Sequence, residues 1–420
     1  MQANLNEYRM LVTNGPRRGW ITEKLIGVIY SRLSKIKGGS LAITWKNRRR
    51  ILGDGPMHAA VNMTVHDESF FWALATRGTV GAAEAYMDGA WETEDLLGVL
   101  QLVLENYTMM SSLEGGLARA SQPLFRAYHR VRKNTLNGSR SNISAHYDLS
   151  NDFFEKMLDE TMMYSSGIFE SPDATMHDAS IAKLDAICRK LDLQPDERVL
   201  EIGTGWGGFA IYAAKNYGVH VTTTTISKKQ YSYAKKRVAE EGLEDRITLL
   251  LKDYRELEGT FDKLVSIEMI EAVGHQYYDA FFRVCQKRLK PTGAALIQAI
   301  TIVDHMYEAA RDSVDFIKRY IFPGSCIPSV TILCDSARKS SDLKLFHLQD
   351  IGEDYAKTLL AWREKFWENI EDIRELGFDD SFIRMWDYYL CYCIAGFRYR
   401  HISDVHMLMT RPLSRLNSPV

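Results

Sequence analysis

Hydrophobic residues recur with a helical period near the start of the chain. Between Trp20 and Ile36 the apolar positions fall every three or four residues, and Lys24, Arg32 and Lys35 lie between them. The pattern predicts an amphipathic helix with a basic polar face. Such a helix either packs its apolar stripe on its own domain, with the charges in solvent, or docks on an anionic bilayer.

Short runs in which apolar and polar residues alternate follow this helix, and further helical patterns come after them. Alternation with a period of two is typical of half-buried strands. The mixture predicts a small α+β domain over residues 1–115, which we expect to associate with lipid. The runs lie at 41–45, 59–65, 70–74 and 96–107.

The pattern changes beyond residue 144, where short apolar strands alternate with helices. Repeated β/α units of this length predict an α/β domain over residues 144–420, built on a doubly wound, mainly parallel sheet. The predicted helices lie at 179–191 and from about 208, and the predicted strands lie at 198–202, 219–226, 247–251, 263–267 and 294–297.

Charge is unevenly distributed, although the chain carries a formal net charge of only -2. Residues 1–50 hold eleven Lys and Arg against two acids, Glu7 and Glu23. Residues 116–147 hold six Lys and Arg, no acid and several turn-forming residues. We therefore expect a basic linker over residues 116–143.

Composition narrows the class of protein. Hydrophobic residues make up 46% and charged residues 25%, and no run approaches the roughly 20 apolar residues that cross a membrane. The N-terminus lacks the apolar core of a secretory signal, so we expect a cytoplasmic protein that is at most peripheral at the inner face of the membrane. The six cysteines have the irregular spacing of reduced thiols, and neither a metal site nor a nucleic-acid partner is expected.

A glycine-rich turn stands where the first strand of the predicted sheet enters a helix. It contains Gly203 and Gly205, and Glu201 lies inside the preceding strand. Such turns serve nucleotide-binding folds in general, but this spacing departs from the GxGxxG that cradles a pyrophosphate. The acid and the spacing favour S-adenosylmethionine, whose ammonium and ribose hydroxyls need carboxylate, carbonyl and amide partners.

Further candidate cofactor residues follow the next strands. Thr225 and Gln230 lie at the end of the second strand and can meet polar groups of the cofactor. Tyr254 and Arg255 follow the third strand, where an adenine is edged by a polar group and covered by a ring. The expected cofactor site is completed by Tyr164, Ser165, Ile226 and Ile267.

Four motifs carry a more specific resemblance: HYDLSNDFFEKMLDETMMYSS at 146–166, LEIGTGWGG at 200–208, TTTTISKKQ at 222–230 and SVDFIKRYIFPGSCIPSV at 313–330. From about residue 144 onward the chain resembles the cyclopropane fatty acid synthase and mycolic acid methyltransferase family. The DGAWE segment near Asp88 resembles the N-terminal domain of the bacterial phospholipid enzymes.

The resemblance implies a class I, Rossmann-like methyltransferase. Such an enzyme transfers a methyl or methylene group from S-adenosylmethionine to the double bond of an unsaturated acyl chain in a membrane phospholipid. The expected partners are therefore an anionic bilayer surface and its acyl chains. The resemblance also implies a homodimer.

The resemblance further implies a bicarbonate ion in the acyl site, bound by a cysteine, a glutamate, a histidine and a tyrosine. The glutamate corresponds to Glu271 in MIEAVG and the tyrosine to Tyr355 in IGEDYAKTLLAW. This chain departs from the family at the other two positions, because Ser166 replaces the cysteine and Gln298 replaces the histidine.

The two departures bear on the product. An alkene that attacks a sulfonium methyl leaves a carbocation, and a base must take a proton from the new methyl group to close the ring. Ser166 and Gln298 can donate hydrogen bonds to an anion but lack the proton affinity of a thiol or an imidazole. They are either neutral variants around the same ion or a sign that a methyl or methylene branch forms.

A second carboxylate lies close to the first in sequence. Glu268 occupies a position that the family often gives to glycine, and paired acids in one pocket can raise one pKa and create a usable base. Glu271 is either the bicarbonate partner or the base, and Glu268 either adds to this site or binds elsewhere. Ring faces stabilise cations, so Tyr164, Tyr355 and Phe169 are candidates to line the acyl path.

Two other classes of protein compete with this interpretation. A nicotinamide-dependent oxidoreductase would use the same sheet, but GxGxxG is missing and Thr225 and Gln230 stand where an acid would hold the ribose. A catalytically inactive lipid carrier would have lost its catalytic groups at Ser166 and Gln298. The complete cofactor motif, which this chain retains, argues against such a carrier. The double-bond position and the head group of the substrate stay open.

Overall fold

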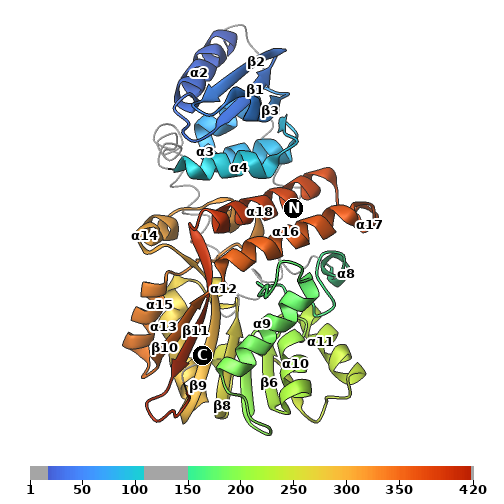
Figure 1. The fold of residues 1–420 in the computed structure, drawn as a ribbon, viewed down its shortest axis with the longest axis vertical. Helices are drawn as coiled ribbons and strands as arrows, with labels where there is room; N and C mark the ends of the chain where they lie inside the picture. The colour runs from blue at the N-terminus through green and yellow to red at the C-terminus, as the bar shows by residue number, and fades with distance from the viewer. Residues whose placement is uncertain (1–17, 108–149, 418–420) are drawn as a thin grey trace. The chain divides into compact units, whose positions relative to one another are not determined.

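The computed structural model describes residues 18–107 and 150–417 (Figure 1). The chain divides into two compact units, residues 1–121 and 122–420, and each has its own sheet. The predicted linker at 116–143 lies outside the described residues. Among the described helices, none combines the length and the apolar character needed to cross a membrane.

A four-stranded sheet in the order β2-β1-β3-β4 forms the centre of the N-terminal unit. Lys46 and Asn47 both take positive φ between β1 and β2, as a two-residue hairpin turn requires. The elements are α2 (Arg18–Leu33), β1 (Ser40–Trp45), β2 (Arg48–Gly53), η2 (Met57–Ala59), β3 (Val61–Val65), α3 (Ser69–Met87), β4 (Trp91–Glu92) and α4 (Leu96–Glu105).

The predicted amphipathic helix corresponds to α2. Ile26, Ile29 and Leu33 are buried on its inner side, because they recur at helical spacing and face α3 and the sheet. The hydrophobic pattern did not predict β2, whose first half is the basic run Arg48–Arg50. Charged residues suit an exposed edge strand, and β2 is the outermost strand of this sheet.

A seven-stranded sheet in the order β10-β11-β9-β8-β5-β6-β7 forms the centre of the second unit. The five strands from β9 to β7 in this order are parallel, which confirms the predicted α/β fold. The strands are β5 (Arg198–Ile202), β6 (His220–Thr225), β7 (Ile247–Leu251), β8 (Phe261–Ile267), β9 (Leu289–Ile302), β10 (Lys344–Asp350) and β11 (Ile402–Thr410).

Two antiparallel strands, β10 and β11, extend the sheet beyond β9 and were not predicted. The helical elements of this unit are α8 (Asn151–Glu155), α9 (Met176–Lys190), α10 (Gly208–Tyr217), α11 (Lys228–Glu240), η3 (Tyr254–Glu256), α12 (Ile270–Val273), η4 (His275–Tyr277), α13 (Tyr278–Arg288), α14 (Asp304–Asp312), η5 (Ile317–Ile321), α15 (Val330–Ser340), α16 (Gly352–Glu368), α17 (Ile370–Glu375) and α18 (Asp380–Arg398).

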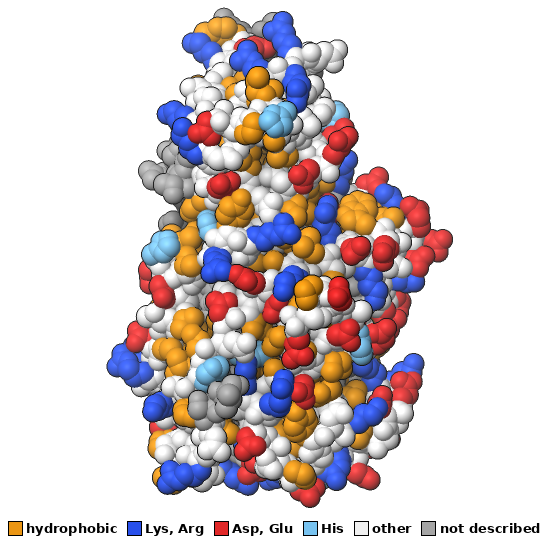
Figure 2. Space-filling view, in the orientation of Figure 1, with side chains coloured by type: hydrophobic (Ala, Val, Ile, Leu, Met, Phe, Trp, Pro, Cys, Tyr) orange, Lys and Arg blue, Asp and Glu red, His pale blue; other side chains and the backbone are white. Residues whose placement is uncertain are grey.

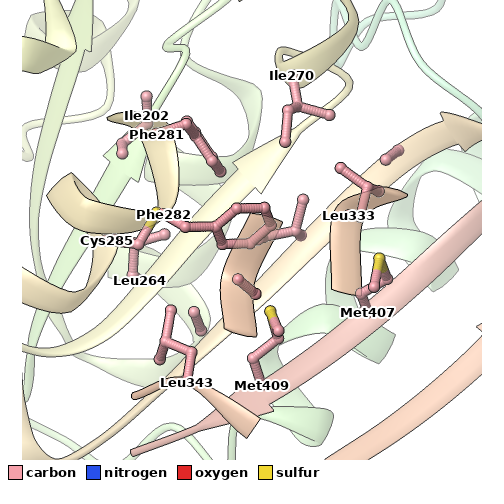
Figure 3. Close-up of a cluster of buried hydrophobic side chains, with 14 of the residues drawn as sticks. Ile202, Leu264, Ile270, Phe281, Phe282, Cys285, Leu333, Leu343, Met407 and Met409 are labelled. Atoms are coloured by element: carbon pink, nitrogen blue, oxygen red, sulfur yellow. The ribbon is translucent and has the colours of Figure 1, made fainter. Parts of the chain in front are cut away.

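Helices cover both faces of this sheet (Figure 1). Leu264 packs with Phe281 and Phe282 on the face covered by α13 and α15 (Figure 3). The next residue, Val265, packs with Phe209 on the opposite face, against α9 and α10. Because successive strand residues point to opposite faces, continuous apolar runs are needed in strands buried on both sides.

A pair of long helices, α16 and α18, lies at the carboxyl end of the parallel strands (Figure 1). Trp362 from α16 and Trp386 from α18 are almost fully buried. These helices bring aromatic side chains over the sheet edge from which the glycine turn and Glu268 emerge.

Candidate active site

The strand order of the large sheet reverses between β5 and β8. β6 lies on one side of β5 and β8 on the other, and all three run parallel. Ligands of open α/β sheets bind outside the carboxyl ends of the strands at such a point. The turn at Gly203 follows β5 and Glu268 follows β8, so two adjacent strands deliver the candidate cofactor turn and the candidate acid to one edge.

The backbone of the glycine turn takes a conformation that side chains disfavour. Gly203 has φ 106° and Gly205 has φ 52°. A Cβ at Gly203 would lie 3.3 Å from the Met269 side chain, whereas a Cβ at Gly205 would meet nothing within 4 Å. The turn therefore leaves room for a ligand beside the backbone.

Glu201 is the acid of this turn, and it is 2% exposed. Its Oε2 has no hydrogen-bond partner among the described residues, and burial raises the pKa of its carboxyl to about 8. A buried polar atom without a partner is costly unless a ligand satisfies it. The ammonium and ribose hydroxyls of S-adenosylmethionine are donors that fit this oxygen.

The end of β6 holds the next predicted cofactor residues. The Thr225 hydroxyl donates to Gln230 Oε1 at 2.9 Å and accepts from the Ser227 amide at 3.1 Å. The Ser227 hydroxyl in turn caps α11 by accepting from the Gln230 amide. These bonds fix Gln230 at the ligand-binding edge, and Ile226 is half-buried beside them.

The residues after β7 combine a buried ring with a paired guanidinium. Tyr254 packs edge-on against Phe281, and its hydroxyl has no hydrogen-bond partner within the described ranges. Arg255 donates to both carboxylate oxygens of Asp253, at 2.8 and 2.7 Å. The pairing orients Arg255 along the turn, and Ile267 is half-buried at the end of β8.

The segment before α9 contributes Tyr164 and Ser165. The Ser165 hydroxyl accepts from the fully buried Lys183 Nζ at 2.6 Å. Tyr164 stacks on Trp362 with ring centres 5.1 Å apart and shares a hydrogen bond with the Tyr389 hydroxyl at 2.9 Å. Burial lowers the pKa of Lys183 to about 8, and the nearby carboxylate of Glu268 opposes this shift.

Glu268 is the centre of the predicted acyl site. Its Oε1 accepts from the backbone amide of Ser166 at 2.8 Å and from Gln298 Nε2 at 2.9 Å. Its Oε2 accepts from the Tyr355 hydroxyl at 2.6 Å. The structure thus brings three of the predicted catalytic residues onto one partly buried carboxylate.

Glu271 lies on α12, one turn further along. One of its oxygens accepts from the backbone amide of Ile300, and the other has no hydrogen-bond partner in the described part of the chain. Burial and then the charge of Glu268 raise the pKa of Glu271 to about 8. At neutral pH this carboxyl therefore mostly carries a proton.

Phe169 is the third ring that was predicted to line the acyl path. The Lys357 ammonium lies 5.5 Å from its ring centre. Tyr355 stacks on Phe397 at 4.4 Å, which holds its hydroxyl toward Glu268.

A family model now places the chain among known proteins. The model described as mycolic acid cyclopropane synthetase matches residues 134–407. The chain belongs to the mycolic acid cyclopropane synthetase family. Membership makes it an S-adenosylmethionine-dependent methyltransferase, as the resemblance implied.

Relatives in this family support the assignment over most of the chain. The cyclopropane-fatty-acyl-phospholipid synthase of Escherichia coli (strain K12) is 38% identical over 360 residues, which cover 84% of this chain and 88% of the relative. The tuberculostearic acid methyltransferase UfaA1 of Mycobacterium tuberculosis is 37% identical over 337 residues, 78% of each chain.

Solved structures of the family have the same fold. The cyclopropane synthase MmaA2 from Mycobacterium tuberculosis aligns with a TM-score of 0.61 at 31% identity and covers 64% of this chain and 98% of its own. The mycolic acid cyclopropane synthase CmaA1, complexed with SAH and CTAB, aligns with a TM-score of 0.60 at 31% identity and with the same coverage.

Sequence reasoning missed several polar residues next to the predicted acyl site. Gln298 Nε2 also donates to Asp404 Oδ2 at 2.7 Å, and Gln298 Oε1 lies 3.3 Å from His406 Nε2. The ammonium of Lys190 lies 2.6 Å from His406 Nδ1. Asp404 and His406 lie on β11, and Lys183 and Lys190 on α9. The signal that could have revealed them is a charged residue within a helix or strand that is otherwise mostly buried.

Proposed function

We propose that this enzyme adds a methylene group from S-adenosylmethionine to the double bond of unsaturated acyl chains in membrane phospholipids and forms a cyclopropane ring. One observation carries the proposal: a hydrogen-bonded carboxylate, Glu268, leaves the strand next to the cofactor turn. Ring closure needs a base at this place, since a proton must leave the methyl group that the cofactor has just delivered.

Aromatic side chains support the same chemistry. Tyr164, Trp362 and Tyr355 form a continuous set of ring contacts beside Glu268, with centres 5.1 and 6.1 Å apart. Ring faces attract cations, so they stabilise the carbocation that forms before the ring closes. The cofactor supplies the electrophilic methyl group, and Glu201, Gly203, Gly205, Thr225, Gln230 and Tyr254 are the residues we propose to hold it.

We also propose that the N-terminal unit docks the enzyme on an anionic bilayer. Trp20, Ile21 and Val28 on α2 are 65, 46 and 52% exposed, although all three are large and apolar. Lys24 lies 3.9 Å from the Trp20 ring centre, and the exposed Lys35 follows shortly after the end of the helix. Apolar anchors among lysines are typical of helices that lie in a membrane interface.

Basic side chains extend beyond this helix. Arg48, Arg49 and Arg50 on β2 are exposed, and Figure 2 shows Lys and Arg side chains beside hydrophobic ones on the N-terminal unit. The cytoplasmic leaflet is the anionic one, so we propose a peripheral enzyme at that face. We propose a homodimer as well, which size-exclusion chromatography with light scattering tests.

The decisive experiment uses purified protein, S-adenosylmethionine and vesicles of a mono-unsaturated phosphatidylglycerol. We expect a gain of one CH2 in the acyl chain by mass spectrometry. Ozonolysis then separates the isomers, because it cleaves a methylene branch and leaves a cyclopropane ring. A product that ozone cleaves would contradict ring formation and support the methylene branch, and an unchanged lipid would contradict the proposed function.

A further inference from the structure

We propose that the carboxylate of Glu268 takes the place of the bicarbonate ion and is itself the base that closes the ring. This inference rests on the proposed function and names the residue that carries out its last step. The resemblance implied bicarbonate between residues 166, 271, 298 and 355, and the arrangement of these residues does not fit the ion.

The hydrogen-bond donors that would bind bicarbonate already donate to Glu268. The Ser166 amide and Gln298 Nε2 donate to one oxygen of Glu268, and the Tyr355 hydroxyl donates to the other, all within 2.6 to 2.9 Å. A carboxylate is planar and offers two oxygens on one carbon, as bicarbonate does. The side chain therefore supplies the same anionic group and occupies its partners.

The changes at positions 166 and 298 fit an internal carboxylate. The Ser166 hydroxyl donates to the Gly167 carbonyl at 2.9 Å, so only the backbone of this residue contacts Glu268. Gln298 uses its two N–H groups for two acids, Glu268 and Asp404. A ring nitrogen of histidine has at most one hydrogen, so an amide suits two neighbouring carboxyls better.

The backbone at Glu268 supports a role for this particular side chain. Its φ is 45°, in the left-handed region that disfavours any residue with a Cβ and that glycine adopts freely. The Glu268 amide donates to the Gln298 carbonyl at 2.9 Å, which fixes this conformation through the β8–β9 pairing. Strained residues that persist in a rigid frame gather at functional sites.

The charges around Glu268 leave it able to act as a base. The pKa of Glu268 is raised overall, because burial outweighs the lowering effects of the Tyr355 hydrogen bond, the Ser166 amide and the charge of Lys183. A raised pKa makes its carboxylate a stronger base. Burial, and then the charge of Glu268, raise the pKa of the neighbouring Asp404 well above its ordinary value. Glu271 is the third acid at the site, and it is mostly neutral at pH 7.

The proposed step balances without another reactant. The alkene's π electrons form the first bond to the transferred carbon, and the electrons of the broken C–S bond remain on sulfur. Glu268 then takes a proton from the new methyl group, and the electrons of that C–H bond form the second ring bond. The carboxyl returns this proton to solvent between turnovers.

The test removes the internal carboxylate and offers the ion in its place. Turnover on unsaturated phosphatidylglycerol vesicles is measured in CO2-free buffer and with added bicarbonate, for wild type, Glu268→Gly, Glu268→Gln and the exposed-site control Glu258→Gln. We expect wild type and the control to be active without bicarbonate. Both variants at 268 should lose about a hundredfold or more of turnover, the scale of a general base.

Added bicarbonate should restore turnover only to Glu268→Gly, because the side chain of Glu268→Gln still fills the space that the ion would take. Titration with S-adenosylmethionine shows which variants keep a folded cofactor site. A wild type that needs bicarbonate, or a folded Glu268→Gln with near-normal turnover, would overturn the inference. Should Glu268→Gly not fold, the bicarbonate response of wild type and the turnover of Glu268→Gln decide the question. A wild type without any product would instead contradict the proposed function.

Discussion

Tyr355→Phe removes one oxygen atom from the candidate active site and nothing else. The hydroxyl donates to Glu268 Oε2 at 2.6 Å, and the ring stacks on Phe397 at 4.4 Å, a contact that phenylalanine preserves. Tyr355 is only 5% exposed, so water replaces its hydrogen bond poorly. The variant therefore isolates the contribution of this donor to the carboxylate.

The expected size follows from the loss of a hydrogen bond to a charged group, about 1.5 to 3 kcal/mol. The hydrogen bonds from Ser166 and Gln298 to Glu268 remain in the variant, so we expect the lower end of this range. Since one pKa unit corresponds to about 1.4 kcal/mol, the pKa of Glu268 should rise by roughly one unit. A base works in its deprotonated form, so the acid limb of the pH profile should move to higher pH by about this amount, and turnover on the acid limb should fall by up to about tenfold.

The assay is the pH dependence of kcat/KM on unsaturated vesicles, with S-adenosylmethionine affinity measured in parallel. Tyr212→Phe is the matched control, because its hydroxyl also donates to a carboxylate, Asp185, at 3.0 Å but lies on α10 away from the acyl site. We expect the control to keep the wild-type profile. An unshifted acid limb in Tyr355→Phe, with normal cofactor affinity, would refute the assignment of Glu268 as the titrating base.

Three further predictions concern other parts of the chain. Gly203→Val should abolish S-adenosylmethionine binding in calorimetry, because φ at Gly203 is 106° and a Cβ would lie 3.3 Å from a neighbouring side chain. The control is Gly242→Asn, which should keep cofactor binding, because Gly242 also has positive φ but a Cβ there would meet nothing within 4 Å. The double variant Lys24→Glu, Lys35→Glu should weaken co-sedimentation with anionic vesicles, since each lysine contributes on the order of 1 kcal/mol. Vesicle binding that is unchanged by high salt and by this charge reversal would contradict membrane docking. Glu271→Gln should retain more turnover than the variants of the proposed base, because its carboxyl already carries a proton near pH 7; an equal loss would point back to Glu271.

The sequence alone determined the α/β fold and the cofactor turn, because both depend on local patterns. Short apolar runs that alternate with helical patterns are typical of strands in such a fold, so 198–202 and 247–251 were predicted with the bounds that the structure has. Glycine takes positive φ more readily than other residues, so a glycine-rich run predicts a turn, and Gly203 and Gly205 both have this conformation. The basic amphipathic helix was visible because its signal is also local.

Only the tertiary structure decided how the acids are arranged. Strand pairing brings Gln298 opposite His406 on β11 and beside Ile267, more than thirty residues earlier in the chain. Neither β11 nor its Asp404 had a periodic signal, because its charged side chains interrupt an otherwise buried strand. From sequence, Glu271 was the bicarbonate ligand or the base, and Glu268 either added to this site or bound elsewhere. Their roles separate because hydrogen bonds are made in three dimensions: donors from three distant segments converge on Glu268, whereas Glu271 has one backbone donor and keeps one oxygen without a partner among the described residues.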